Sequence, residues 1–483
     1  MKNLKKILLL ILVTSLFNRC TDHVDYEAIE GYQITSEIYF QQEADYDAAL
    51  VGTYDVLQWL FFNIQLGAIA SEITLCGGES ATDYIGIQQI DDMTHYPENN
   101  VLRQIWQFLY EGVNRANYME ENKANIDFEG KEAMYGEVYF LRAYYYFELV
   151  KFFGDVPLFT EARLTAGQAG TLTRTPKDEV YAQIELDLQN AIASLPNSQS
   201  QVGRVNKYTA YALLGKVLLY QDKFAEAASA LDNVIGVYSL VSDYGSQFLR
   251  FGENGPESVF EIQYSNQSNW YDWGCAHCSE GNYAIIMNGP RGWSGPEYAQ
   301  GWSFNVPTEE FYNSFEEGDS RRDATVLDIE AFAAATGSSY TEGYDHTGYF
   351  NNKYIPRAGE SGGQTELNYL TNFRIIRYSD VLLMAAEAYN RGGIDDGLAQ
   401  EFLNQVRRRA FGGDDNDISA SGSALTDAIW EERKFELSLE GHRFFDLVRT
   451  GRASSLIAGF VEGKHEVFPI PQQEVDISGL TQN

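Results

Sequence analysis

The segment from Phe140 to Pro157 constrains the fold most, because apolar and aromatic side chains occupy nearly every position before Gly154. It continues a run without Pro that begins near Lys131, and glycine is typical just after a helix C-terminus. A helix that is apolar on all sides must be covered by other elements. Arg142 lies inside this run and needs a carboxylate or carbonyl partner, since an unpaired buried charge is costly. The sequence therefore predicts a long buried helix with a structural arginine.

Length and composition indicate a large folded chain. Its 483 residues, of which 44% are hydrophobic, could form two or three domains with a substantial core. The formal net charge of -34 argues against a nucleic-acid partner, because binding a phosphate backbone needs a concentrated basic surface. We interpret the acidity as a solvated surface.

Residues 1–19 have the pattern of an export signal. A basic start precedes the apolar run 7–13, which is too short to span a bilayer as a helix. Cys20 follows and is the candidate lipid-attachment residue of a lipoprotein, with residues 20–42 as an N-terminal tether. Arg19 departs from the small residue typical before such a cysteine, so ordinary cleavage that leaves a free cysteine is the alternative.

The remaining cysteines are Cys76, Cys275 and Cys278. In an exported protein the CxxC pair Cys275 and Cys278 is a candidate disulfide that pins a loop, with a redox pair or half of a zinc site as alternatives. A structural zinc site needs about four ligands, and no second CxxC or HxxxH accompanies this pair, so no metal is predicted. Cys76 is then expected to be a buried free thiol.

Helical periodicity dominates both ends of the chain. A long loop is expected at 66–100, where several glycines and Pro97 interrupt the pattern. Between 239 and 370 the helical pattern gives way to Gly, Asn, Ser, Asp and aromatic residues, with a strand expected at 259–264. Helices are predicted at 43–62, 100–123, 131–153, 177–194, 207–237, 374–390, 399–409 and 423–440.

The run 207–237 has the spacing of a tetratricopeptide helical hairpin. Small residues, Gly215 and Ala227, fall where two antiparallel helices would touch, and larger ones fill the groove beside them. Because each hairpin buries its face against a neighbour, helices from both ends should form one scaffold. The predicted fold is mostly α, with the scaffold at 43–238 and 371–483 and an irregular ligand-binding insertion at 239–370.

Aromatic residues gather on polar, Gly-rich sequence inside the insertion. Such rings suit a sugar, which presents C–H groups on one face and hydroxyls around its rim, although packing into a small core of the insertion is the alternative. The early loop adds Tyr84 beside Asp83. Polar groups available nearby are Asn269, Asp272, Asn282, Asn288, Arg291 and Glu297. The aromatic candidates are Trp270, Tyr271, Trp273, Tyr283, Trp293, Tyr298 and Trp302.

Catalytic patterns are weak. A glycosidase needs two carboxylates across one bond, whereas adjacent Glu431 and Glu432 on a helix point about 100° apart and fit a solvated or salt-bridged role better. The six histidines are scattered without HExxH, and no GxSxG or P-loop occurs. His442 is interpreted as a packed core residue. No catalytic residue and no cofactor are predicted.

Several strings together resemble the SusD/RagB family of outer-membrane glycan-binding lipoproteins of Bacteroidetes. They keep the family's order and span most of the chain. The strings are Phe140–Tyr144 with Gly154–Pro157, Arg174–Pro176, Arg377–Ala388, Glu431–Leu437, Gly441–Leu447 and Phe468–Gln472.

The resemblance implies a tetratricopeptide-like scaffold, an arc of aromatic rings on the loops named above, and anchoring at the cell surface through Cys20. It also implies a partner, a SusC-like TonB-dependent transporter in the outer membrane. The expected function is capture of an oligosaccharide and its delivery to that transporter without catalysis. Binding of a peptide or another nutrient on the same scaffold is the first alternative, and a glycoside hydrolase is the second.

Overall fold

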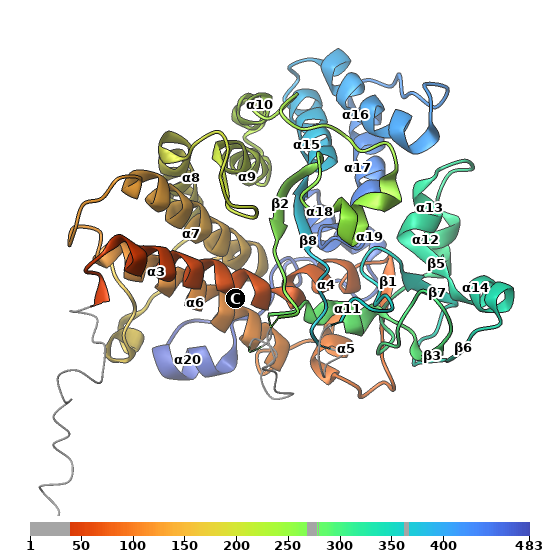
Figure 1. Ribbon diagram of the computed structural model, residues 1–483, viewed down its shortest axis with the longest axis horizontal. Coiled ribbons are helices and arrows are strands. Elements are labelled where there is room, and N and C mark those ends of the chain that lie inside the picture. The colour runs from red at the N-terminus through yellow and green to blue at the C-terminus, as the bar shows by residue number, and fades with distance from the viewer. Residues whose placement is uncertain (1–38, 268–277, 279, 362–366) are drawn as a thin grey trace, which may run out of the picture.

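The computed structural model describes residues 39–267, 278, 280–361 and 367–483 (Figure 1). Most elements of this part are helices, joined by short strands, so the predicted mostly α fold is confirmed. Within these residues, no helix combines the length and the apolar character that crossing a membrane requires.

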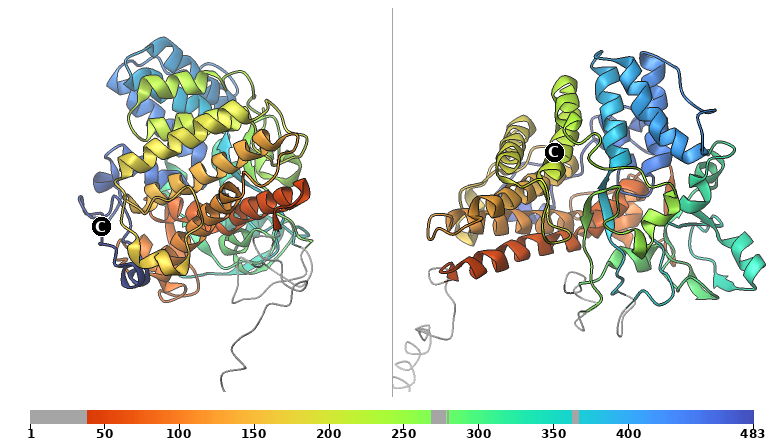
Figure 2. Two further views of the ribbon diagram at one scale, coloured as in Figure 1. Left: turned by 90° about the vertical axis from the view of Figure 1, so that its left-hand side faces the viewer. Right: turned by 45° about the horizontal axis from the view of Figure 1, so that its top comes forward.

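A row of packed helices forms the scaffold (Figures 1 and 2). Its helices are α6 (Asn100–Glu121), α7 (Lys131–Phe153), α8 (Lys177–Ser194), α9 (Lys207–Leu219), α10 (Phe224–Asp232), α15 (Tyr378–Arg391), α16 (Asp396–Phe411) and α17 (Ser423–Leu437). Each of the first five packs on the next, and α15 then packs on α10 although the segment 233–377 separates them in sequence. Helices from both ends therefore share one scaffold, as their hairpin pattern predicted.

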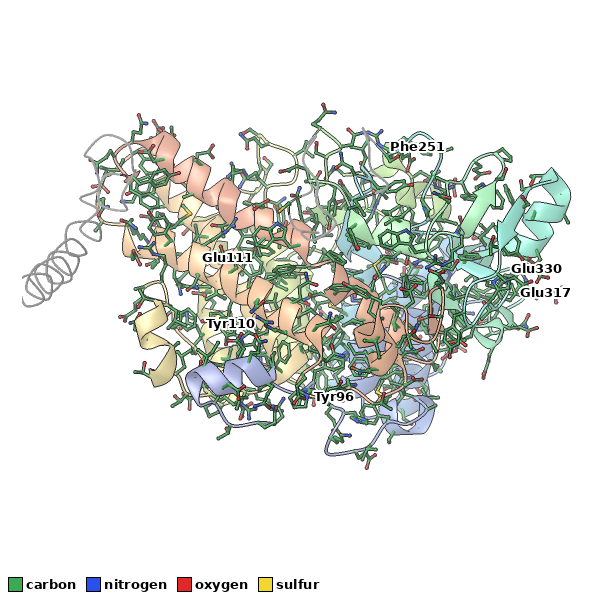
Figure 3. The ribbon with its side chains drawn as sticks, turned by 90° about the horizontal axis from the view of Figure 1, so that it is seen from below. Tyr96, Tyr110, Glu111, Phe251, Glu317 and Glu330 are labelled. Atoms are coloured by element: carbon green, nitrogen blue, oxygen red, sulfur yellow. The ribbon has the colours of Figure 1, made fainter. Side chains whose placement is uncertain are left out.

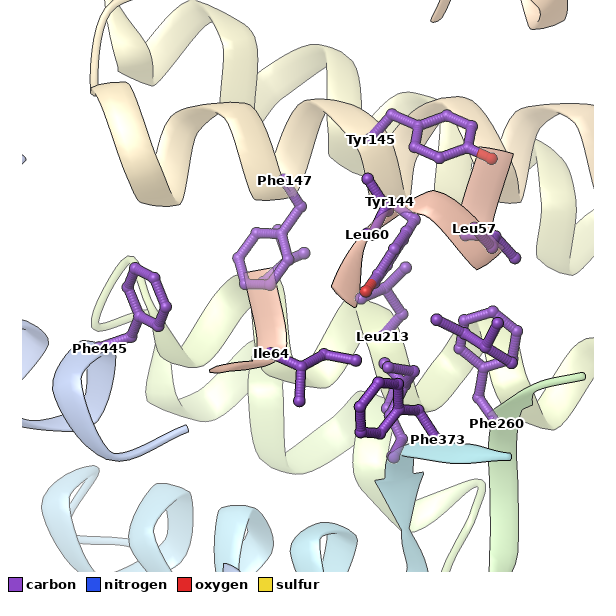
Figure 4. Close-up of a cluster of buried hydrophobic side chains, with 14 of the residues drawn as sticks. Leu57, Leu60, Ile64, Tyr144, Tyr145, Phe147, Leu213, Phe260, Phe373 and Phe445 are labelled. Atoms are coloured by element: carbon purple, nitrogen blue, oxygen red, sulfur yellow. The ribbon is translucent and has the colours of Figure 1, made fainter. Parts of the chain in front are cut away.

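Helix α7 is the centre of this scaffold and matches its predicted bounds, with Gly154 following at φ 70. Its side chains are buried on most sides, and the helix packs against α6, α8 and α9. Figure 4 shows Tyr144 and Phe147 of α7 beside Ile64 and Leu213, with Phe260 and Phe373 completing the cluster. An apolar helix of this kind is stable only when covered in this way.

Arg142 has the carboxylate partner that its burial requires. Its Nε and Nη2 donate to the two carboxylate oxygens of Asp187 on α8, at 2.8 and 2.7 Å. Its Nη1 donates to Asn117 Oδ1 on α6 at 2.9 Å and to the Thr160 carbonyl at 2.6 Å. One guanidinium thus joins three neighbouring helices and the segment after α7.

The hairpin of α9 and α10 has the predicted small-residue contact. A Cβ atom added to Gly215 would lie 2.5 Å from side-chain atoms of Leu231. The two helices therefore approach so closely that any larger residue at this position would displace the Leu231 side chain.

The prediction of a long loop at 66–100 is wrong. The helical start consists of α3 (Glu43–Asp55), the 3-10 turn η1 (Val56–Trp59) and α4 (Phe61–Ile69), and β1 (Thr74–Gly77) and α5 (Ile85–Asp91) follow. Gly67 lies inside α4. This position needs glycine because the backbone of Gly441 occupies the space where a side chain would lie. Glycine is here a packing requirement and not a helix breaker.

Short elements fill residues 239–370, where the sequence indicated an irregular segment. The strands form two-stranded antiparallel pairs: β2 (Ser258–Ile262) with β8 (Phe373–Arg377), β1 with β4 (Phe304–Pro307), β3 (Arg291–Ser294) with β6 (Ser339–Thr341), and β5 (Val326–Asp328) with β7 (Tyr349–Asn351). The short helices here are α11 (Tyr283–Asn288), α12 (Glu309–Asn313), α13 (Arg321–Thr325) and α14 (Ile329–Thr336). The 3-10 turns η3 (Tyr244–Phe248) and η4 (Arg250–Gly252) also lie here, whereas η2 (Ala166–Thr171) lies between α7 and α8.

The strand expected at 259–264 corresponds to β2, whereas the helix predicted from residue 374 begins only at Tyr378. Residues before it pair with β2 as β8, and Arg377 at the junction is extended, with φ -104 and ψ 159. Tertiary pairing overrides the local helical pattern there.

Buried ion pairs hold the second part of the scaffold to the strands. Arg377 donates to Glu257, Glu436 and Glu440 at 2.6 to 2.8 Å, and all four side chains are almost completely buried. Glu432 on α17 is also buried and pairs with Arg321 at 2.6 Å. The paired interpretation of Glu432 is therefore the correct one.

The chain ends in α18 (Arg443–Arg449), α19 (Ala453–Leu456) and α20 (Gln472–Ser478). His442, just before α18, lies near Lys216, Asp380 and Arg433, and its burial and Lys216 hold its pKa well below the usual range. His442 is half-buried, and its neutral ring agrees with a structural role. Helix α20 lies along α6 on the face shown in Figure 3, near the labelled Tyr110.

Candidate functional site

A pocket of ≈ 280 Å³ lies where the early segment 83–84 meets residues 283–304. Three predicted ligand-binding rings, Tyr84, Tyr283 and Trp302, come together in it from segments far apart in sequence. The complete lining is Asp83, Tyr84, Tyr283, Met287, Arg291, Trp302 and Phe304.

Tyr84 is held in an unusual backbone conformation at the start of α5. Its φ of 50 and ψ of 55 place it in the left-handed region, which non-glycine residues adopt at a cost. Its ring stacks on Phe62, with centroids 5.4 Å apart, and meets the edge of Phe304 at 6.3 Å. These contacts fix a ring that is still 37% exposed.

Tyr283 is the first residue of α11, and its neighbours determine where its ring lies. The Asn282 side chain caps this helix by accepting from the Ala284 backbone N–H at 3.1 Å. The Tyr283 ring packs on Phe61, with centroids 4.7 Å apart, and stands edge-on to Trp302 at 5.4 Å and 73°. The two half-buried rings of Tyr283 and Trp302 thus form one corner of the pocket.

Trp302 is positioned by backbone contacts with α11. Its N–H donates to the Ile286 carbonyl at 2.9 Å. A Cβ atom on the preceding Gly301 would lie 2.4 Å from the Gly289 Cα atom, so only glycine permits this approach. The ring is therefore presented by a segment that lies directly against α11 and the residue after it.

Both pocket phenols stay protonated near neutral pH. Burial raises the pKa of Tyr283 to about 12. Burial and the nearby Tyr283 raise the pKa of Tyr84 further above its ordinary value. Each hydroxyl can therefore donate a hydrogen bond as well as accept one.

Trp293 and Tyr298, two other predicted ligand-binding rings, lie elsewhere. They are 8% and 5% exposed and pack together in a separate cluster of the insertion. Its other members are Leu327, Ile329, Phe350 and Ile355, with Phe332 and Tyr340 at its edge. This packing accounts for both rings without a ligand, as the small-core interpretation proposed.

Other predicted residues lie outside the described part of the chain: Cys20, Asn269, Trp270, Tyr271, Asp272, Trp273 and Cys275. Cys278 is described and is disulfide-bonded, and its predicted partner, Cys275, lies outside the described residues. Cys76 is a buried free thiol, as predicted, and burial raises its pKa.

The polar candidates divide into pocket groups and structural groups. Arg291 and Asp83 line the pocket and are joined by a hydrogen bond of 2.9 Å. Asn288 is buried and donates to the Tyr354 carbonyl, and Glu297 pairs with Arg357 outside the pocket. Met287 and Phe304 were missed, because each has the ordinary pattern of a core residue in the sequence.

The arrangement suits a ligand with both apolar faces and many hydroxyl groups. Aromatic planes offer contact area at low entropic cost, and the phenols, guanidinium and carboxylate supply directional hydrogen bonds. A larger hollow of ≈ 590 Å³ between α3 and β2 has one aromatic residue, Tyr54, in its lining. The smaller aromatic pocket is therefore the candidate ligand site.

Comparison with known proteins identifies the family. Residues 256–464 match the model of the SusD family, and residues 71–219 match one described as "Starch-binding associating with outer membrane". SusD-like protein P2 of Formosa agariphila is 30% identical over 447 residues, which cover 86% of this chain and 85% of that protein. This chain belongs to the SusD family.

Solved structures agree with this assignment. A laminarin-binding SusD-like protein superposes with a TM-score of 0.84 at 35% identity, covering 92% of this chain and 99% of the other. Surface glycan-binding protein A from Bacteroides thetaiotaomicron in complex with laminarihexaose gives 0.82 at 29% identity, covering 91% and 99%. The mostly helical fold is therefore that of SusD-like proteins.

Proposed function

We propose that this chain is a cell-surface glycan-binding protein that captures an oligosaccharide in the pocket of Tyr84, Tyr283 and Trp302. The observation that carries the proposal is this convergence of three rings with Arg291 and Asp83 in a SusD-family chain. Ring faces would pack on the C–H face of a sugar while the polar groups bond its hydroxyls.

The ligands named for similar proteins suggest which glycan to test first. Two of those proteins are described with laminarin or laminarihexaose, and the second matching family model concerns starch. Laminarin is therefore the first probe and starch the second. Similar proteins described as glycan-binding also favour binding without hydrolysis.

We further propose a cellular location and a protein partner for this chain. The bound oligosaccharide would be delivered to a SusC-like TonB-dependent transporter, with the chain anchored at the outer-membrane surface through a lipid on Cys20. Family membership and the export signal at residues 1–19 support this placement. A pull-down of the lipidated protein that recovers no TonB-dependent transporter would contradict the delivery step.

Affinity electrophoresis in gels containing laminarin or starch tests the binding step. Tyr84→Ala, Tyr283→Ala and Trp302→Ala should each weaken retardation by about tenfold or more, because each removes a ring from the binding surface. Phe251→Ala is the matched control, since Phe251 is 79% exposed and is absent from the pocket lining (Figure 3).

The same assay separates the alternatives. Retardation lost in the ring variants without release of reducing sugar supports glycan binding. Release of reducing sugar by the purified protein would contradict the non-enzymatic mechanism. Lack of retardation by any polysaccharide of a broad panel would favour a peptide or another nutrient. Trp270→Ala and Trp273→Ala belong in the same series, because the sequence predicts that both rings contact the ligand.

A further inference from the structure

Arg291 presents the cationic group of the aromatic pocket, and its guanidinium is only partly used by the protein. Nη2 donates to Asp83 Oδ2 at 2.9 Å. Nη1 lies 3.6 Å from Glu79 Oε2, which is an ion-pair distance but too long for a hydrogen bond. Nε is buried and has no hydrogen-bond partner among the described residues. The N–H groups of Nη1 and the second N–H of Nη2 therefore remain for a ligand in the pocket that Arg291 lines, whereas the buried Nε lies out of its reach.

Asp83 is fixed where it meets Arg291. Its Oδ2 also accepts from the Glu79 backbone N–H at 2.8 Å, and its own N–H donates to the Ser80 carbonyl at 2.9 Å. The carboxylate is thus part of a closed turn that directly precedes Tyr84 in the pocket wall. Its position relative to the rings is set by the backbone.

The charges at this point of the pocket do not favour an anionic ligand. One guanidinium stands against two carboxylates, Asp83 and Glu79, on a chain whose formal net charge is -34. A sulfate or uronate would have to compete with Asp83 for Arg291 and would meet like charge from Glu79. A hydroxyl group avoids this conflict, because it can accept from a free guanidinium N–H and donate to a carboxylate.

We propose that Asp83, by its ion pair with Arg291, makes the pocket selective for uncharged sugar residues and against sulfated or uronic acid residues. Arg291 supplies hydrogen bonds to sugar hydroxyls, and Asp83 both orients it and cancels its attraction for anions. This inference rests on the proposed glycan-binding function and adds the class of glycan to it.

Laminarin and chemically sulfated laminarin form a matched pair of probes, because the backbone is the same and only the charge differs. Wild-type protein should bind laminarin at least about tenfold more tightly than its sulfated form in titration calorimetry. Asp83→Asn should reduce or reverse that ratio, since Asn keeps an acceptor for the Glu79 N–H while freeing the charge of Arg291. The new affinity for sulfated laminarin should fall as salt is raised.

Two further variants keep the test independent of loop distortion. Glu79→Gln removes the more distant carboxylate without breaking the Arg291 to Asp83 hydrogen bond and should shift the ratio in the same direction by a smaller factor. Asp92→Asn changes an exposed carboxylate outside the pocket lining and should leave the ratio unchanged.

The outcomes distinguish this inference from the proposed function. Equal or tighter wild-type binding of sulfated laminarin, or Asp83→Asn and Glu79→Gln affecting both probes equally, would overturn the selectivity while glycan binding stands. Binding confined to anionic polysaccharides such as alginate would also overturn the selectivity while glycan binding stands. Failure of every neutral and anionic polysaccharide to bind would overturn the proposed function and this inference together.

Discussion

Gly67 inside α4 lies directly against the backbone of Gly441, so that a Cβ atom on Gly67 would come within 2.1 Å of the Gly441 carbonyl oxygen. Gly441 in turn has φ 89 and its own Cβ would meet Ile64 at 3.0 Å. Two glycines far apart in sequence thus bring the early helix and the segment before α18 into backbone contact. The early helices and the C-terminal part of the scaffold are joined at this point.

Gly67→Ala should destabilise the protein, because the atom that it adds overlaps with backbone that cannot move aside. We expect a loss on the order of 1–3 kcal/mol or more in the free energy of unfolding. Urea denaturation followed by circular dichroism measures it. Gly413→Ala, at a position with no heavy atom within 4 Å of the added Cβ, is the control and should change stability little. Equal stability of both variants would refute the contact.

Regular elements were predictable from sequence where local pattern and packing agree. The bounds of α7 and α8 follow from an unbroken run that ends at Gly154 and from a start at Pro176. Gly67 misled the prediction because the reason for a glycine lies in Gly441, which the local pattern does not contain. Arg377 misled it similarly, because β8 exists only through pairing with β2.

The candidate site was predictable as a composition but not as a geometry. Trp293 and Trp302 lie in the same polar, Gly-rich stretch, yet one enters a small core and the other lines the pocket. What separates them is which segments fold beside each ring. Tyr84 joins Tyr283 and Trp302 only because α4 brings Phe61 and Phe62 beneath these rings.

Arg142→Met should cost about 3–5 kcal/mol in the free energy of unfolding, because it leaves the carboxylate of Asp187 buried without its cation. Chemical denaturation monitored by tryptophan fluorescence measures the loss. The matched control is Arg163→Met, since Arg163 pairs with Glu121 at the surface and should cost at most about 1 kcal/mol. Similar losses in both variants would show that the burial of the Arg142 pair has no energetic consequence.

Asp91 should make stability fall as pH rises from about 4 to about 7. Burial, with Asp92 and Asp345 nearby, raises its pKa to about 7, although its carboxylate accepts from the Cys76 N–H at 2.7 Å. Between about pH 4 and pH 7 the folded state therefore keeps a proton that the unfolded state has lost. The free energy of unfolding falls across this range and levels off once Asp91 is deprotonated in both states. Asp91→Asn should match wild type near pH 4 and be more stable near pH 8, on the order of 1–3 kcal/mol.

Thermal unfolding of both proteins across this pH range measures the difference. Asp415→Asn, an exposed carboxylate in a loop, is the control and should follow the wild-type curve. A difference between Asp91→Asn and wild type that does not change with pH would contradict the assignment of this titration to Asp91.

His95 should have the opposite effect on the acidic side of neutrality. It is buried, its ring lies 5.2 Å from His465 and 5.0 Å from Phe468, and burial together with His465 lowers its pKa to about 4. The unfolded state therefore takes up a proton first as pH falls below about 6.5, and the stability that the neutral ring contributes is lost down to pH 4. His95→Phe keeps a ring beside Phe468 and removes the titration, so it should lose less stability than wild type between pH 6.5 and pH 4. The measurement is the free energy of unfolding at several pH values, and parallel curves for the two proteins would show that His95 does not carry this dependence.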